Sequence, residues 1–193
     1  IDKIKVEKLT SNVTQSDINE MIENLQKQRG EWVVIDKASE KGIARTLAFL
    51  SGNLAPQGAI VKSTSISPNL YSSLGNYYHE GRARVFYDET SAIAAVKSTG
   101  DQRVLPGEVI VLLGRGPMGA GMPETAQITS ALKYTKALSE NALITDGRFS
   151  GFSSGPCIGH VGPESLSGGP IGKLRDGDQI KIEINKDHCV GRV

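Results

Sequence analysis

The sequence contains no long apolar run and only two cysteines. No stretch of about 20 consecutive apolar residues, the length that a transmembrane helix requires, is present. No cationic leader stands before an apolar segment either, so we expect neither a membrane span nor a secretory signal. Cys157 and Cys189 are too far apart to form a CxxC pair, the spacing typical of metal and redox sites. We therefore expect no disulfide and a cytoplasmic, thiol-reducing location.

The sequence has no segment in which charges of one sign are concentrated. The chain has 22 basic and 21 acidic residues, mixed along its whole length, and a formal net charge of +1. A nucleic acid or an anionic membrane would require a concentrated basic face, so neither is an expected partner. The GxxxxGK(S/T) and GxGxxG phosphate loops are absent in the required register, and so is the GxSxG elbow of serine hydrolases. Nucleotide binding and serine hydrolysis are therefore not favoured.

The length is sufficient for a self-supporting core. A chain of 193 residues can bury enough apolar surface to fold without disulfide or metal support. We expect a single domain that spans residues 1–193. The first residue is Ile1 rather than Met, which leads us to expect a piece of a longer chain.

Hydrophobic patterns predict many short strands and few helices. Apolar runs and apolar-polar alternation predict strands at 32–35, 59–62, 82–87, 109–113, 142–145 and 179–184, with 190–193 pairing back as a hairpin partner. Helices are predicted at 16–28, after Asp88 and from Pro123 onward, and the polar segment 63–80 is predicted to be an irregular excursion. With 22 glycines, this order favours a closed or strongly curved sheet with helices outside it.

The segment TDGRFSGFSSG at 145–155 follows a predicted buried strand and is the strongest candidate for a site. Ser150, Ser153 and Ser154 lie there among glycines, which have no Cβ and let hydroxyl and backbone N–H groups approach a ligand closely. The alternative is a surface connection in which glycine supplies only positive φ. The spacing alone leaves both interpretations open.

A second glycine-rich segment, GRGPMGAGMPE at 114–124, joins a predicted buried strand to a predicted helix. Free N–H groups and the helix dipole at such a junction favour an anion, such as a phosphate or a carboxylate. Glu124 lies in the first turn of the predicted helix. It is either a favourable partner of the dipole or a metal ligand.

Six motifs occur along the chain in a distinctive order. They are GNLAP at 52–56, HEGRARVF at 79–86, GAGMPE at 119–124, ITDGRFSG at 144–151, GHVGPE at 159–164 and GGPI at 168–171. Together they resemble the C-terminal domain of the dihydroxy-acid and phosphogluconate dehydratase family, over roughly 52–184. The segments GPCIGH at 155–160 and GKLRDGD at 172–178 resemble the sugar-acid branch, which includes xylonate dehydratase.

The resemblance implies an α/β fold of the swivelling β/β/α type, with a barrel-like mixed sheet flanked by helices and the site loops at one end. It also implies the C-terminal half of a hydro-lyase, a dehydratase that converts a 2,3-dihydroxy acid to a 2-keto-3-deoxy acid. The family's cofactors are an iron–sulfur cluster and Mg²⁺, and its cluster cysteines belong to an N-terminal domain outside this chain. We therefore expect the chain alone to be folded but inactive.

The resemblance also implies roles for particular residues. Ser150 is the expected general base, acting as an alkoxide on the C2 proton, and Glu124 is the expected Mg²⁺ ligand. Some relatives use a second hydroxyl shortly after this serine. Phe152 interrupts that pattern here, which leaves open whether Ser153 or Ser154 replaces it.

Ser153, His160 and Arg148 are the expected substrate-binding residues. A histidine between glycines also fits a structural hydrogen-bond donor, and an arginine in a loop also fits a surface ion pair. The expected partners are a small hydroxy acid and the missing N-terminal domain, within a homo-oligomer of the intact enzyme. The alternative function is a non-catalytic module, similar to a small subunit, that binds a partner chain or an organic acid.

Overall fold

The computed structural model describes residues 46–186, 188 and 190–193. The predicted helix at 16–28, the predicted strand at 32–35 and Cys189 lie outside the described residues. No helix in the described part of the chain is both long enough and apolar enough to cross a membrane.

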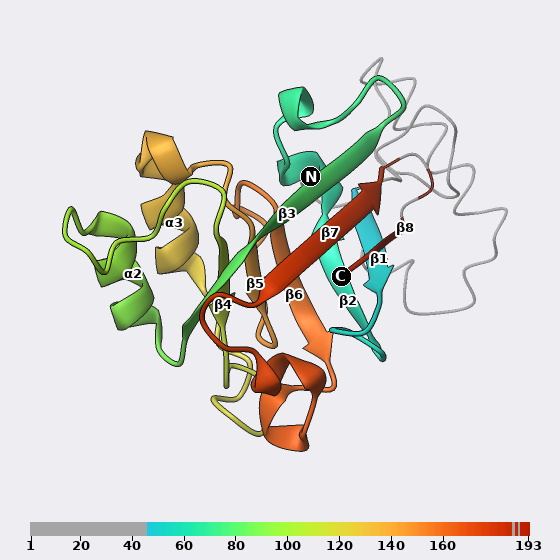
Figure 1. The fold of residues 1–193 in the computed structure, drawn as a ribbon. Coiled ribbons are helices and arrows are strands. Elements are labelled where there is room, and N and C mark those ends of the chain that lie inside the picture. The colour runs from blue at the N-terminus through green and yellow to red at the C-terminus, as the bar shows by residue number, and fades with distance from the viewer. Residues whose placement is uncertain (1–45, 187, 189) are drawn as a thin grey trace, which may run out of the picture. The chain divides into compact units, whose positions relative to one another are not determined.

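Eight strands form a closed barrel with mixed strand directions (Figure 1). They are β1 (Leu47–Ser51), β2 (Gly58–Lys62), β3 (Asn76–Phe86), β4 (Val109–Leu112), β5 (Leu143–Thr145), β6 (Cys157–Gly162), β7 (Gln179–Asn185) and β8 (Val190–Arg192). The order around the barrel is β1-β2-β6-β5-β4-β3-β7-β8. β3, β4, β5 and β6 are mutually parallel, and β8 closes the barrel by pairing in parallel with β1. The predicted barrel-like mixed sheet is therefore confirmed.

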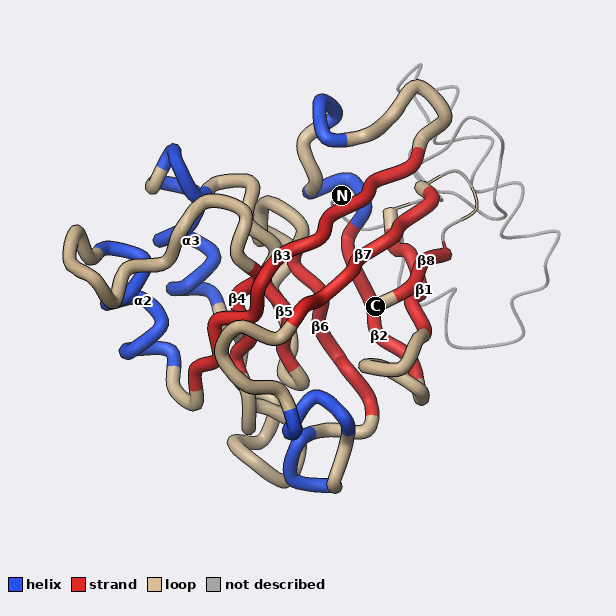
Figure 2. Tube along the Cα trace, in the orientation of Figure 1, coloured by secondary structure: helices blue, strands red, loops and turns tan. Residues whose placement is uncertain are grey.

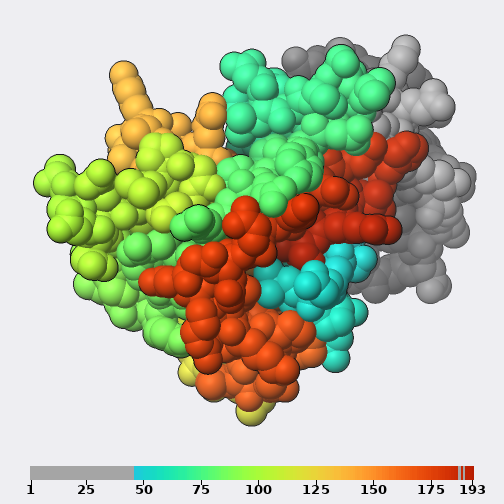
Figure 3. Space-filling view, viewed as in Figure 1, coloured from blue at the N-terminus to red at the C-terminus, as the bar shows by residue number. Residues whose placement is uncertain are grey.

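Two α-helices, α2 (Glu89–Lys97) and α3 (Ala126–Tyr134), lie side by side outside the barrel (Figures 1 and 2). Short 3-10 turns occupy several connections: η3 (Ser63–Ser65), η4 (Pro68–Leu70), η5 (Lys136–Leu138), η6 (Ser165–Ser167) and η7 (Pro170–Lys173). The segment that carries η6 and η7 gathers at one end of the barrel (Figures 1 and 3). The expected arrangement of helices outside the sheet is confirmed.

β4 is buried on both faces, as its apolar run predicted. Val109 and Val111 pack into the barrel interior with side chains from the other strands. Ile110 and Leu112 alternate to the opposite face and pack against α2 and α3. The helices therefore cover the face of the parallel strands, as is usual where parallel strands are buried on both sides.

The two helix starts differ in how well the sequence predicted them. Asp88 caps α2 as predicted, because its Oδ1 accepts a hydrogen bond from the backbone N–H of Ser91 at 2.7 Å. α3 begins at Ala126 rather than at Pro123. The physical reason is that Glu124 forms a β-bridge with Arg148, which keeps that part of the chain extended.

Part of the sheet was not predicted. β3 begins at Asn76, so the last part of the supposed excursion at 63–80 is strand. It pairs along its whole first half with β7, whose Ile182 and Ile184 complete the barrel interior. β1 and β6 also form strands that the sequence analysis missed. β1 pairs with its sequence neighbour β2 and with the distant β8, and β6 pairs with the distant β2 and with β5.

Candidate active site

The serine loop, defined here as residues 146–156, joins β5 to β6. Within it the chain turns tightly around Ser150. The backbone N–H of Phe152 donates a hydrogen bond to Ser150 Oγ at 3.2 Å, and the N–H of Ser153 donates to the Ser150 carbonyl at 3.1 Å. The Ser150 hydroxyl is half-buried. It therefore has a backbone donor directed at its oxygen and remains reachable from outside.

A cavity of about 230 Å³ lies beside the serine loop. Its lining includes the predicted residues Ser150, Ser153 and His160, which come from the loop and from β6. The remaining lining residues are Leu47, Ile60, Lys62, Ser65, Phe149, Gly151, Cys157 and Gly159. The fold therefore gathers three of the five predicted site residues around one space.

Ser153 and His160 present different polar groups to this cavity. Ser153 is only 7% exposed, and its buried Oγ has no hydrogen-bond partner among the residues that the structure describes. His160 is exposed, has a φ of 54°, and donates its backbone N–H to the Gly147 carbonyl at 2.8 Å. A non-glycine residue in this left-handed region is uncommon and clusters at functional sites. His160 also borders a neighbouring hollow of about 530 Å³, so the two spaces meet at this residue.

Glu124 and Arg148 lie next to each other but do not line the 230 Å³ cavity. Arg148 is exposed, and its Nε donates to the Met122 carbonyl at 2.7 Å. The Glu124 carboxylate is also exposed, and it makes no hydrogen bond or ion pair with any other residue that the structure describes. Met122, the residue that Arg148 binds, borders the neighbouring hollow together with His160.

Two buried carboxylates hold the glycine-rich segment 114–124. Asp146 accepts hydrogen bonds from the backbone N–H groups of Gly114 and Arg115, at 3.2 and 2.8 Å. Glu164 accepts from Met118 at 2.9 Å, and a Cβ on the nearby Gly116 would overlap its carboxylate. The predicted preference of this loop for a carboxylate is therefore satisfied within the chain. Because Thr125 is the N-cap residue of α3, Glu124 lies just before the helix and not in its first turn, where the sequence predicts it.

Lys62 is a residue of this cavity that sequence reasoning missed. It ends β2, is half-buried, and donates from Nζ to the carbonyl of Gly151 at 2.6 Å. The two residues are 89 positions apart in the sequence. No motif spacing could therefore have joined them. The only available signal was the position of Lys62 at the end of a predicted strand.

The chain that carries this site is similar to known proteins. Residues 33–193 match a family model described as the C-terminal domain of dihydroxy-acid/6-phosphogluconate dehydratases. The chain belongs to this family. The D-xylonate dehydratases YagF and YjhG of Escherichia coli are each 48% identical to it, over 82% and 81% of its length. A dihydroxy-acid dehydratase of Clostridium novyi is 44% identical over 72% of its length. These alignments cover 24% of each relative, so the chain spans about a quarter of the length of these curated relatives.

Cys157 in the dehydratase domain lies at the start of β6 and is buried, as expected of a small core side chain. Burial raises the pKa of its thiol to about 12. Its Sγ donates to the Ser154 carbonyl at 3.4 Å. The thiol is therefore protonated at neutral pH and unreactive in the folded domain.

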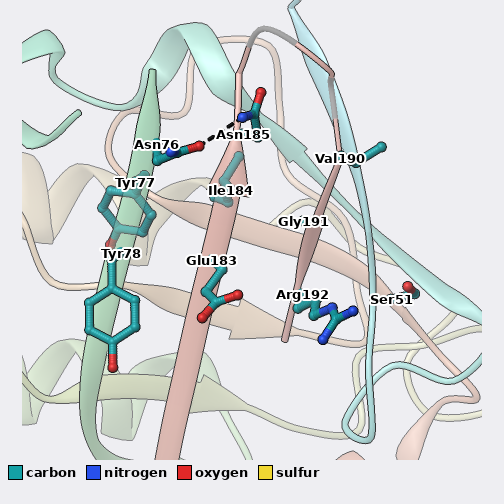
Figure 4. Close-up of a pocket in the computed structure, with 10 residues that line it drawn as sticks. All are labelled: Ser51, Asn76, Tyr77, Tyr78, Glu183, Ile184, Asn185, Val190, Gly191 and Arg192. Atoms are coloured by element: carbon teal, nitrogen blue, oxygen red, sulfur yellow. Dashed lines mark hydrogen bonds between the residues drawn. The ribbon is translucent and has the colours of Figure 1, made fainter. Parts of the chain in front are cut away.

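Another hollow of the dehydratase domain, of about 590 Å³, lies across β3, β7 and β8 (Figure 4). Asn185 Nδ2 donates to Asn76 Oδ1 at 2.7 Å across its upper edge, and Glu183 and Arg192 lie opposite each other on neighbouring strands. None of the predicted site residues lines it. The candidate site therefore remains the region around the serine loop.

Proposed function

We propose that this domain supplies the general base to an enzyme that dehydrates a 2,3-dihydroxy acid, a sugar acid, to a 2-keto-3-deoxy acid. The observation that carries the proposal is the cavity shared by Ser150, Ser153 and His160, in a chain that belongs to a dehydratase family. The two relatives named as D-xylonate dehydratases support a sugar acid as the substrate class.

In this proposal Ser150 removes the C2 proton as an alkoxide. The C3 hydroxyl takes up a proton from solvent and leaves as water, the C2–C3 double bond forms, the resulting enol tautomerises to the 2-keto acid, and Ser150 returns its proton to solvent. A free serine hydroxyl is far too weak an acid to be ionised at neutral pH, so the site must stabilise the anion. The Phe152 N–H directed at Ser150 Oγ is one group that supports this role.

Ser153 and His160 are proposed to bind substrate hydroxyls. A buried hydroxyl without a partner is costly, and a ligand hydroxyl or a water molecule would satisfy the Ser153 Oγ. His160 borders both spaces, and its imidazole can accept or donate a hydrogen bond. Arg148 is proposed to bind the substrate carboxylate, because its Nε is fixed on Met122 while its terminal nitrogens remain available.

Glu124 is proposed to hold a Mg²⁺ ion together with ligands from outside the described residues. Its exposed carboxylate, which pairs with no other described residue, is the hard oxygen ligand that Mg²⁺ prefers. No group of three or more His, Cys, Asp or Glu side chains suited to a metal occurs among the described residues, so Glu124 would be one contributor of several. When bound, the ion would act as a Lewis acid on substrate oxygens.

An iron–sulfur cluster does not fit the described residues. Their one cysteine, Cys157, is buried and its thiol is protonated, whereas clusters are held by several thiolates. We propose that the cluster and the remaining ligands belong to an N-terminal domain of a longer chain, of which residues 1–193 form the single C-terminal domain. We also propose that the intact enzyme is a homo-oligomer.

The test is a panel of aldonic and branched dihydroxy acids assayed anaerobically with the full-length enzyme. Ser150→Ala should abolish turnover while substrate binding and cluster content stay near wild type, because a base acts on the proton only in the transition state. Ser154→Ala is the matched control, since Ser154 lies in the same loop but does not line the cavity. If Ser150→Ala kept more than about a tenth of the rate, less than about 1.4 kcal/mol of barrier would have been lost, too little for the sole base.

The proposed role of Glu124 as a Mg²⁺ ligand is tested by the Mg²⁺ dependence of the rate. Glu124→Gln keeps the shape of the side chain but removes the charge, so the Mg²⁺ concentration required for half-maximal rate should rise along with the loss in rate. An unchanged magnesium dependence would exclude Glu124 as a ligand. A full-length protein that bound the acids but converted none of them would support the non-catalytic alternative.

A further inference from the structure

The serine loop is anchored at two points by one short segment at the end of β2. Lys62 Nζ donates to the Gly151 carbonyl at 2.6 Å. Ser65 Oγ lies 2.8 Å from the Gly155 carbonyl, and the Gly155 N–H donates to the Ser65 carbonyl at 2.9 Å. These contacts lie on either side of Ser153. Lys62 and Ser65, which also line the cavity, therefore fix the loop at both of these points.

Lys62, which anchors the loop, also brings a positively charged ammonium group to the cavity. Lys62, Cys157 and His160 are the titratable groups that line the cavity, from β2 and β6, and no carboxylate among the described residues lines it. The cysteine is protonated at neutral pH, since burial raises its pKa to about 12. The ammonium of Lys62 is thus not neutralised by an acid in the cavity. In a half-buried setting such a charge favours a nearby anion more strongly than it would in water.

The contact geometry links this charge to Ser150. The carbonyl that Lys62 binds belongs to Gly151, the residue directly after Ser150, and the next N–H along the chain, that of Phe152, donates to Ser150 Oγ. Binding the Gly151 carbonyl orients the peptide unit that carries the Phe152 N–H. The same ammonium therefore fixes a hydrogen-bond donor to Ser150 and adds a positive charge to its cavity.

We propose that Lys62 is a positioning residue for the reaction, holding the Gly151–Phe152 peptide so that its N–H stabilises the anionic form of Ser150. This inference rests on the proposed role of Ser150 as the base. Ser65 contributes by fixing the far end of the loop, without charge.

The test uses the full-length enzyme with Lys62→Met, Lys62→Gln and Lys62→Arg. Lys62→Met should lower kcat at least tenfold and change KM less than twofold, because Lys62 acts on the base rather than on the substrate. The acid limb of the kcat–pH profile should move to higher pH, since the alkoxide is harder to form without the cation. Lys62→Arg should restore part of kcat and move the limb back. Lys97→Met, an exposed lysine on α2, is the control and should match wild type.

A second readout does not depend on turnover. Hydrogen exchange at the Phe152, Ser153 and Gly155 amides should speed up in Lys62→Met and Lys62→Gln, while amides of β4 stay protected. If Lys62→Met does not fold, Lys62→Gln and Lys62→Arg carry the test. A loss of rate with an unchanged pH profile in the neutral variants, or a wild-type kcat, would overturn the proposal. If Ser150→Ala stays active, the assignment of the base fails instead.

Discussion

Four hydrogen bonds converge on the carboxylate of Asp146, and they come from two separate segments of the domain. The donors are the N–H groups of Gly114 and Arg115 and both the N–H and the hydroxyl of Ser165, the last at 2.6 Å. Asp146 is only 2% exposed. A buried charge with this many donors is satisfied, but removal of the charge leaves the donors without an adequate acceptor.

We predict that Asp146→Asn destabilises the chain by about 3 kcal/mol, the scale expected when charge-assisted hydrogen bonds are lost in a buried site. The amide retains one acceptor oxygen, but its NH₂ group would face backbone donors. Urea denaturation measures the change in the free energy of unfolding. Asp101→Asn, at an exposed position, should change it by less than about 0.5 kcal/mol. Equal effects of the two substitutions would contradict this account.

Cys157 gives a prediction for alkaline pH. Burial raises its pKa from 9.0 to about 12 in the folded protein. Because the pKa of Cys157 is higher in the folded than in the unfolded chain, the contribution of this thiol to the free energy of unfolding is fully present below about pH 9. It is lost as the pH rises towards 12. In a Cys189→Ser background, thiolate absorbance at 240 nm, taken as the difference from the same background with Cys157→Ala so that tyrosinate absorbance cancels, should therefore appear only near pH 12 in the folded chain and near pH 9 in urea. Thiolate absorbance in the folded chain by pH 9 would show that the thiol is not buried.

The site was predictable residue by residue only where a motif carried the information. Ser150, Ser153 and His160 were named from short segments of sequence, and the fold brings them to one cavity. Their roles remain predictions. Lys62 could not be named, because its partner Gly151 is 89 residues away and the strand pairing that joins them is a property of the whole barrel.

β3 requires a glycine at position 81, where the strand packs against the turn that contains Gly107. A Cβ on Gly81 would overlap the carbonyl oxygen of Gly107, which is backbone and cannot rotate away. We predict that Gly81→Ala destabilises the chain by about 2 kcal/mol or more, through displacement of β3 from its neighbours. Gly100→Ala is the control, because the nearest atom to its Cβ would lie 3.6 Å away, an ordinary contact. Thermal unfolding followed by circular dichroism compares the two, and a Gly81→Ala variant as stable as Gly100→Ala would exclude the clash.

The elements that the sequence predicted are those whose pattern is local. The apolar run of β4 and the alternation of β7 identify their strands without reference to partners. β6 was missed because its sequence, CIGHVG, has two glycines and a residue with positive φ, and it becomes a strand by pairing with β2 and β5. The start of α3 was misplaced because a bridge between Glu124 and Arg148 overrides the preference of Pro123 for a first helical turn.

For the whole molecule, the coverage of its relatives leads to a direct prediction. The chain spans about a quarter of each of the named dehydratases, and its described residues provide one buried cysteine. Anaerobic reconstitution of the 193-residue chain with iron and sulfide should therefore give no cluster absorbance and no dehydratase activity. The full-length enzyme, treated identically, is the control. A stable cluster on the isolated chain would show that its ligands lie within these residues.

The strand that closes the barrel follows every other described strand in the sequence. Phe49 on β1 pairs with Val190 on β8. During synthesis about 140 residues are therefore added after β1 before β8 is available to pair with it. At ~5–20 residues per second, this delay is roughly 7 to 30 seconds. Until β8 pairs, the sheet formed by the other seven strands has two unpaired edges, on β1 and on β7. Such edges are the surfaces through which incomplete sheets aggregate, and the arrival of only three strand residues, Val190–Arg192, removes both at once.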